Sequence, residues 1–123
     1  MAFPETLFGE LTAHPGGGVP VTTLTPSQTE TRFRQLVRQW KDESRYLSNT
    51  AQMAMLRSYQ SIIGMGPPAV PLLLAELRHE PDHWFWALES ITLENPVPPQ
   101  DAGQLDKMAR AWIAWGLGAR VIT

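Results

Sequence analysis

The stretch from Gly64 to Ile91 constrains the fold most, because it holds two apolar segments separated by a turn of roughly three or four residues at Pro81. Apolar residues recur at spacings of three and four in both segments; they are Val70, Leu73, Leu74, Leu77, Trp84, Ala87, Leu88 and Ile91. Such spacing places side chains on one face of an α-helix, whereas a half-buried strand alternates apolar and polar residues. The stretch therefore predicts a helical hairpin with its corner at Pro81.

Residues 25–28 carry the start signals of a helix that precedes the hairpin. Thr25 can cap this helix, Pro26 suits its first position, and Gln28 completes a capping box. The apolar stripe that follows consists of Phe33, Leu36, Val37 and Trp40. These residues predict a long amphipathic helix.

Two further helices are expected on either side of the hairpin. One follows a break at residues 46–49 and runs to Ile63, with Gly64 as its left-handed stop. The other covers residues 101–115, with Gly116 as its cap. The pattern as a whole predicts an all-α fold, a small bundle of about five helices.

The chain is expected to divide into a flexible N-terminal arm (1–24), a single α-helical domain (25–118) and a C-terminal tail (119–123). Three adjacent glycines in the arm increase the entropy that folding would have to overcome. The arm also carries an apolar cluster at near-helical spacing, namely Phe3, Leu7, Phe8 and Leu11. A partly ordered tail is the favoured interpretation, and a short peptide that docks on another surface is the alternative.

Composition excludes several functional classes. The longest apolar run, Val70 to Ala75, is far shorter than the roughly 18–20 residues that cross a bilayer. The first residues lack the positive and apolar regions of a secretory signal, so a cytoplasmic protein is expected. Zero cysteines removes disulfides and thiolate metal sites, and neither a metal nor a cofactor is expected.

Charge is distributed unevenly along the chain, although the net charge is only −2. Residues 1–30 and 61–106 are acidic, whereas residues 31–60 and 107–123 are basic. A basic face on the first helix is formed by Arg34, Arg38, Lys41 and Arg45. A solvated helix face is the favoured interpretation, and attraction of phosphates or an acidic partner is the alternative. The acidic 61–106 region offers an internal or neighbouring-subunit counterpart.

The sequence His79-Glu80-Pro81-Asp82-His83 matches the letters of the zinc-protease signature H-E-x-x-H. That signature requires an unbroken helix, and Pro81 would interrupt it. Three histidines and no nucleophile elbow give no support to a catalytic triad. No catalytic residue is therefore expected, and we expect a protein that is not an enzyme.

Bulky aromatic residues are the strongest candidates for a binding surface. Trp84, Phe85 and Trp86 occupy three successive positions, so at least one large ring must face away from the main core. Trp115 lies one position off the stripe that contains Trp112. Because tryptophan often anchors protein interfaces, we expect Trp84, Trp86, Trp112 and Trp115 to contact a protein partner.

The stretch Ile62–Leu77, with the pattern A-x-P-x-L-L-x-x-L followed by Pro81-Asp82, resembles a single HEAT-type repeat. Over roughly residues 30–118, the segments PDHWFWAL, NPVPP and AWIAWG are similar to a family of short uncharacterised bacterial α-helical proteins. The chain departs from that family at Leu93, where a glycine is usual. The resemblance implies stacked helices, an architecture that usually presents a binding surface. It brings no established activity.

We therefore expect a non-enzymatic protein–protein interaction module that binds a protein partner or a second copy of the chain. The resemblance implies a bacterial accessory or regulatory role, such as an antitoxin-like or phage-associated one. The alternative is a nucleic-acid-binding protein that uses the basic face of the first helix. No membrane partner is expected.

Overall fold

The computed structural model describes residues 24–123, and this part of the chain contains six α-helices, one short 3₁₀-helix and no strand. The helices are α1 (Pro26–Ser44), α2 (Thr50–Met55), α3 (Arg57–Gly64), α4 (Ala69–His79), α5 (Phe85–Thr92), η2 (Pro99–Asp101) and α6 (Leu105–Gly118). The all-α prediction is confirmed. The expected N-terminal arm, except for its last residue, lies outside the described residues.

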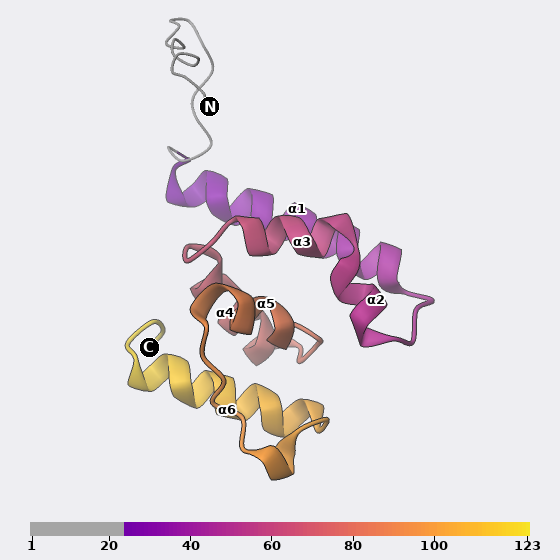
Figure 1. Cartoon of the computed structure of the whole chain (residues 1–123). Helices are drawn as coiled ribbons and strands as arrows, with labels where there is room; N and C mark the ends of the chain where they lie inside the picture. The colour runs from indigo at the N-terminus through magenta and orange to yellow at the C-terminus, as the bar shows by residue number, and fades with distance from the viewer. Residues whose placement is uncertain (1–23) are drawn as a thin grey trace, which may run out of the picture.

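The helices stack in three layers (Figure 1). Helices α1 and α3 lie side by side in the first layer, α4 and α5 form the middle layer, and α6 packs against α4 (Figure 1). Helix α3 also contacts α5, and α1 contacts α4. The expected hairpin, α4 and α5, therefore lies at the centre of the fold, while its likeness to a HEAT repeat stays a prediction.

Helix α1 begins as its sequence signals predict. The Thr25 hydroxyl accepts a hydrogen bond from the Gln28 backbone N–H at 3.1 Å, and the Gln28 side chain accepts one from the Thr25 N–H at 2.9 Å. Phe33, Val37 and Trp40 are buried on one face of the helix. The capping box and the apolar stripe thus fix both the start of α1 and its orientation.

The helix expected to run to Ile63 is two helices, because Leu56 adopts extended backbone with φ −61° and ψ 143°. The break leaves carbonyl groups at the end of α2 without helical donors. The Trp40 indole N–H donates to the Met53 carbonyl at 2.9 Å, and the Gln60 side-chain amide donates to the Ala54 carbonyl at 2.7 Å. One side chain from α1 and one from the first turn of α3 therefore stabilise the break.

The turns around α4 differ from expectation in two places. Gly64 is the last residue of α3, and the left-handed residue is Gly66, with φ 72°. Helix α5 begins at Phe85, so Asp82 lies in the connection and not in the first helical turn. The Asp82 carboxylate accepts a hydrogen bond from the His83 N–H at 2.8 Å, so it bonds within the connection and not at the N-terminus of α5.

Three aromatic residues form the centre of the core and come from three separate parts of the chain. Trp40 of α1, Tyr59 of α3 and Trp84 before α5 are fully buried. The ring centroids of Trp40 and Trp84 are 4.4 Å apart, and those of Tyr59 and Trp84 are 5.6 Å apart. Such contacts add to the stabilisation from burial alone, so this cluster joins the first and middle layers.

The end of the chain packs back onto α6. Helix α6 continues to Gly118, so Gly116 is a buried helical residue and not the expected cap. The backbone N–H groups of Val121 and Ile122 donate to the Gly116 carbonyl at 2.9 and 3.3 Å. The Arg78 guanidinium donates to the Thr123 carbonyl at 3.0 Å. None of the helices in residues 24–123 has the length and apolarity to cross a membrane.

Candidate functional site

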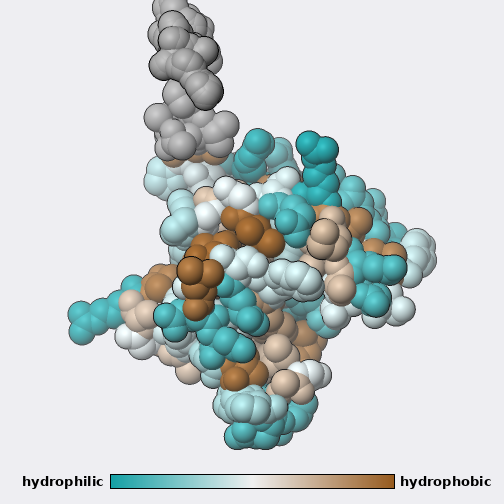
Figure 2. Space-filling model, in the orientation of Figure 1, coloured by the Kyte–Doolittle hydropathy of each residue, from teal (hydrophilic) through white to brown (hydrophobic). Residues whose placement is uncertain are grey.

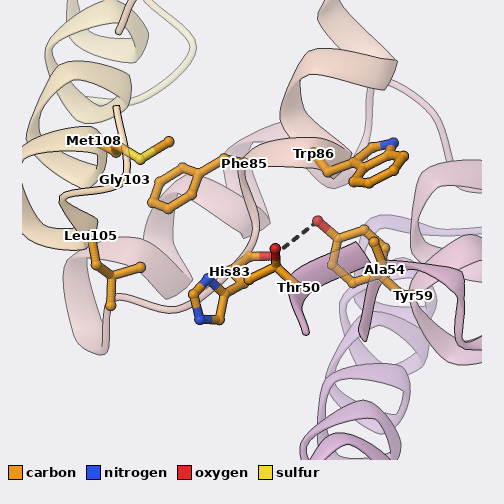
Figure 3. Close-up of a pocket in the computed structure, with 9 residues that line it drawn as sticks. All are labelled: Thr50, Ala54, Tyr59, His83, Phe85, Trp86, Gly103, Leu105 and Met108. Atoms are coloured by element: carbon orange, nitrogen blue, oxygen red, sulfur yellow. Dashed lines mark hydrogen bonds between the residues drawn. The ribbon is translucent and has the colours of Figure 1, made fainter. Parts of the chain in front are cut away.

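A pocket of about 280 Å³ lies where α2, α5 and the start of α6 approach one another (Figure 3). Its lining residues are Thr50, Ala54, Tyr59, His83, Phe85, Trp86, Gly103, Leu105 and Met108. In Figure 3, Phe85 and Met108 lie at one side of the pocket, and Trp86 lies at the other side near Ala54 and Tyr59. The pocket therefore collects residues from four helices and two connections.

The start of α5 places its three successive aromatic residues in three different environments. Trp84 is fully buried in the core, Phe85 is buried against the pocket, and Trp86 is 48% exposed. The expectation that one large ring faces away from the core is thereby confirmed. Trp86 is the residue that combines a large apolar surface with access to solvent.

Tyr59 holds the start of α5 in place from α3. Its hydroxyl donates to the His83 carbonyl at 2.9 Å and accepts from the Ala87 N–H at 2.9 Å. Trp84, the residue at the N-cap, makes no side-chain capping bond, and Ala87 is the third helical residue, whose N–H a cap usually satisfies. Tyr59 thus caps α5 from a neighbouring helix and orients the turn that carries Trp86.

Burial of the phenol raises the pKa of Tyr59 well above its ordinary value, and the nearby carboxylates Asp82 and Glu89 act in the same direction. The hydrogen bond from Ala87 opposes this shift but is outweighed. The phenol therefore keeps its proton at neutral pH and remains a donor to His83. Both hydrogen-bonding roles of the hydroxyl are occupied, so it serves to position the pocket wall.

The chemistry of the pocket suits an apolar group. Ala54, Phe85, Leu105 and Met108 supply apolar walls, and none of the described residues that line the pocket carries a carboxylate. The His83 imidazole and the Thr50 hydroxyl supply polar groups. Within residues 24–123, no cluster of three or more histidine, aspartate or glutamate residues could hold a metal ion.

The four tryptophans expected to contact a partner separate into exposed and buried residues. Trp84 and Trp112 are fully buried, and neither indole nitrogen has a hydrogen-bond partner among residues 24–123, so both are core residues. The prediction that these two residues contact a partner is therefore wrong. Trp115 is half-buried and packs edge-on against Trp112 with ring centroids 5.3 Å apart. Trp86 alone of the four belongs to the pocket.

The basic face of α1 is largely paired with carboxylates. Arg34 lies 2.7 Å from Glu30, and Arg45 lies 2.9 Å from Asp42. Arg38 is exposed and forms no ion pair within residues 24–123. Pairing within one helix reduces the positive charge that this face presents to phosphates.

Lys41 pairs with the acidic region, which is the internal counterpart considered from the sequence. Its ammonium group lies 2.7 Å from Glu80 and 3.8 Å from Glu76. Burial lowers the pKa of Lys41, but the hydrogen bond and charge of Glu80 together with the charges of Glu76 and Asp82 outweigh burial, so the pKa is raised overall. The same hydrogen bond lowers the pKa of Glu80. This contact ties α1 to the end of α4.

The histidines of the H-E-x-x-H match do not share a helix. Helix α4 ends at His79, and the connection that contains Pro81 separates it from His83. Pro81 therefore lies at a corner, as its sequence context predicts. His83 lines the pocket, a position that sequence reasoning missed.

Sequence reasoning also missed the pocket residues supplied by α2 and α6, namely Thr50, Ala54, Leu105 and Met108. Leu105 and Met108 carry the ordinary signal of an apolar helix stripe, and Thr50 begins a short helix. No local pattern shows that these residues meet. Only the tertiary packing of α2, α5 and α6 brings them together.

Comparison with protein-family models, with curated proteins and with solved structures found no match. The resemblance to a bacterial family and to HEAT repeats therefore stays a prediction from the sequence.

Proposed function

We propose that this protein is a non-enzymatic binding module that holds a protein partner at the pocket beside Trp86. The observation that carries the proposal is an indole 48% exposed at the rim of an apolar pocket. Exposed apolar surface costs about 25 cal/mol per Å², and a partner that covers it recovers this free energy. Tryptophan is also among the residues that most often dominate interface energetics.

The apolar lining of the pocket and the exposed indole of Trp86 favour a protein partner. Sites for drug-sized molecules usually enclose about 300–1,000 Å³. This pocket, at about 280 Å³, lies at the lower end of that range, a size that also suits an apolar side chain of a partner. Because its lining residues within 24–123 include no carboxylate, the pocket suits an aliphatic or aromatic group better than a cation. His83 and Thr50 can then orient the partner's backbone through hydrogen bonds.

Nucleic-acid binding through the basic face of α1 has weaker support. Arg34, Lys41 and Arg45 each form an ion pair with a carboxylate, which leaves Arg38 as the member of this face with no such partner in residues 24–123. Phosphate binding depends on several such charges acting together. The accessory role implied by the bacterial resemblance, antitoxin-like or phage-associated, is compatible with a protein-binding pocket.

The proposal is tested with Trp86→Ser, matched by Leu117→Ser on α6. Leu117 is 44% exposed, so the control removes a comparably accessible apolar side chain away from the pocket. Immobilised full-length protein of each variant is incubated with a bacterial lysate, and retained proteins are quantified by mass spectrometry. The protein that is retained is then purified, and its affinity is measured by calorimetry.

We expect Trp86→Ser to weaken this affinity about 30-fold or more, which corresponds to a hot spot of about 2 kcal/mol. Leu117→Ser should bind like the wild type. Circular dichroism confirms that both variants keep their helices. Equal affinity for the wild type and Trp86→Ser would refute the proposal. A dimer in sedimentation that Trp86→Ser dissociates would identify a second copy as the partner.

A further inference from the structure

A second hollow of about 550 Å³ lies on a different face, between the first turns of α1 and the end of α3. Its lining residues are Leu24, Thr29, Arg32, Leu36, Ser61, Gly64, Met65 and Pro68, and none of them belongs to the Trp86 pocket. Figure 2 shows apolar residues in small groups among polar ones on the visible face. Leu24, Leu36 and Met65 give the hollow an apolar wall, and its other lining residues include the polar Thr29, Arg32 and Ser61.

We propose that the segment Phe3–Leu11 of this same chain packs into the hollow beside α1. The apolar residues of this segment are Phe3, Leu7, Phe8 and Leu11, and their near-helical spacing gives one apolar face. The hollow offers a matching apolar wall, in which Leu24, Leu36 and Met65 are only partly buried. Covering both surfaces at once removes apolar area from water on each side.

The connection between segment and hollow permits this contact. Twelve residues, 12–23, separate Leu11 from Leu24, and Leu24 itself lines the hollow. By random-coil statistics, twelve residues span about 20 Å from end to end. Three adjacent glycines, Gly16–Gly18, allow the chain to reverse direction. The short tether sets an effective concentration of the order of millimolar, so weak contacts suffice for occupancy.

Charge also matches. The segment contains Glu5 and Glu10 and no lysine or arginine. Arg32 at the hollow is exposed and forms no ion pair within residues 24–123, unlike Arg34, which pairs with Glu30. An acidic segment therefore fits this hollow better than a basic one.

The test uses paramagnetic relaxation in the full chain. Because the chain has no cysteine, Thr12→Cys carries a single spin label next to the segment. We expect the strongest broadening of amide signals at Ser61, Gly64 and Met65, and little at Gly103 beside the Trp86 pocket. In a second sample, chains that carry the spin label but no nitrogen-15 are mixed with nitrogen-15 chains that carry no spin label. This mixture should give no broadening at these positions, because the contact is within one chain.

The matched control carries Leu7→Ser and Phe8→Ser with the same label. We expect the ratio of docked to undocked chains to fall about tenfold or more, because two apolar side chains no longer contribute. Arg32→Glu should lower the same ratio, and Glu10→Arg should restore it in part. The proposal is overturned if broadening is unchanged in the serine variant, if it is strongest at Gly103, or if it arises only between chains.

Discussion

Tyr59→Phe tests the central link between the fold and the candidate site. The substitution removes one hydroxyl and keeps the ring that packs against Trp84. The His83 carbonyl loses its donor, and the Ala87 N–H loses its acceptor. The variant therefore isolates the hydrogen bonds that cap α5 from the packing of the aromatic cluster.

The magnitude follows from the two groups left without partners. A buried unsatisfied donor or acceptor costs about 1–3 kcal/mol. The Ala87 N–H is buried and the His83 carbonyl is partly buried, so we expect the free energy of unfolding to fall by about 2–4 kcal/mol. Small domains are stable by about 5–15 kcal/mol, so this loss is readily measured by urea denaturation followed by circular dichroism.

The second tyrosine provides the control. Tyr46 is 90% exposed, and Tyr46→Phe should change the free energy of unfolding by no more than about 0.5 kcal/mol. If Tyr59→Phe were as mild as Tyr46→Phe, the hydroxyl would not be stabilising α5, and the capping argument would be wrong. If Tyr59→Phe lost much stability but kept Trp86-dependent binding, the Tyr59 hydroxyl would be needed for the fold and not for binding at the pocket.

The pH dependence of the same variant gives an independent check. Because the pKa of Tyr59 is raised in the folded state, the folded protein holds the phenolic proton more tightly than the unfolded chain. This contribution is complete below the unfolded pKa of about 10 and is lost as the pH rises above it. The free energy of unfolding should therefore fall more steeply above pH of about 10 in the wild type than in Tyr59→Phe.

Three further substitutions test other parts of the fold. Gly116→Ala places a Cβ 2.6 Å from a methyl group of the fully buried Leu74, whereas a Cβ at Gly118 meets no described atom within 4 Å. Gly116→Ala should therefore be less stable than Gly118→Ala by about 1–3 kcal/mol in urea denaturation. Leu93→Gly should raise the free energy of unfolding by about 0.5–1 kcal/mol, because Leu93 adopts φ 60° and is 88% exposed; an unchanged midpoint would contradict this. The lowered pKa of Glu80 stabilises the fold above the pKa of Glu80 in the unfolded chain, and this stabilisation disappears as the pH falls. Glu80→Gln should therefore lose less stability on acidification than the wild type, as measured by unfolding at a series of acidic pH values.

Features that depend on neighbouring residues in the sequence could be predicted. The capping box at residues 25–28 needs only the side chains and backbone of one helical turn. The corner at Pro81 follows from the missing N–H and fixed φ of proline. In each case the signal and the structure lie within a few residues of each other.

Features that depend on distant residues could not be predicted. The break at Leu56 is supported by the indole of Trp40, which lies sixteen positions earlier in the chain. A glycine near the end of a helix is typical of a C-terminal cap. At Gly116, however, a Cβ would collide with the Leu74 and Ile122 side chains, which explains why a glycine is needed inside α6. Both depend on which helices pack together, and a single sequence carries no direct record of that packing.

The aromatic triplet shows how the same limit applies to function. Helical spacing requires Trp84, Phe85 and Trp86 to point in different directions, but it does not say which one faces solvent. That choice depends on where α5 begins, and Tyr59 contributes to fixing this start through its bonds to His83 and Ala87. If α5 began near Pro81, the three rings would lie in a later turn of the helix. The exposure of Trp86 therefore depends on the tertiary packing of α3 against α5, and so does the proposed binding surface.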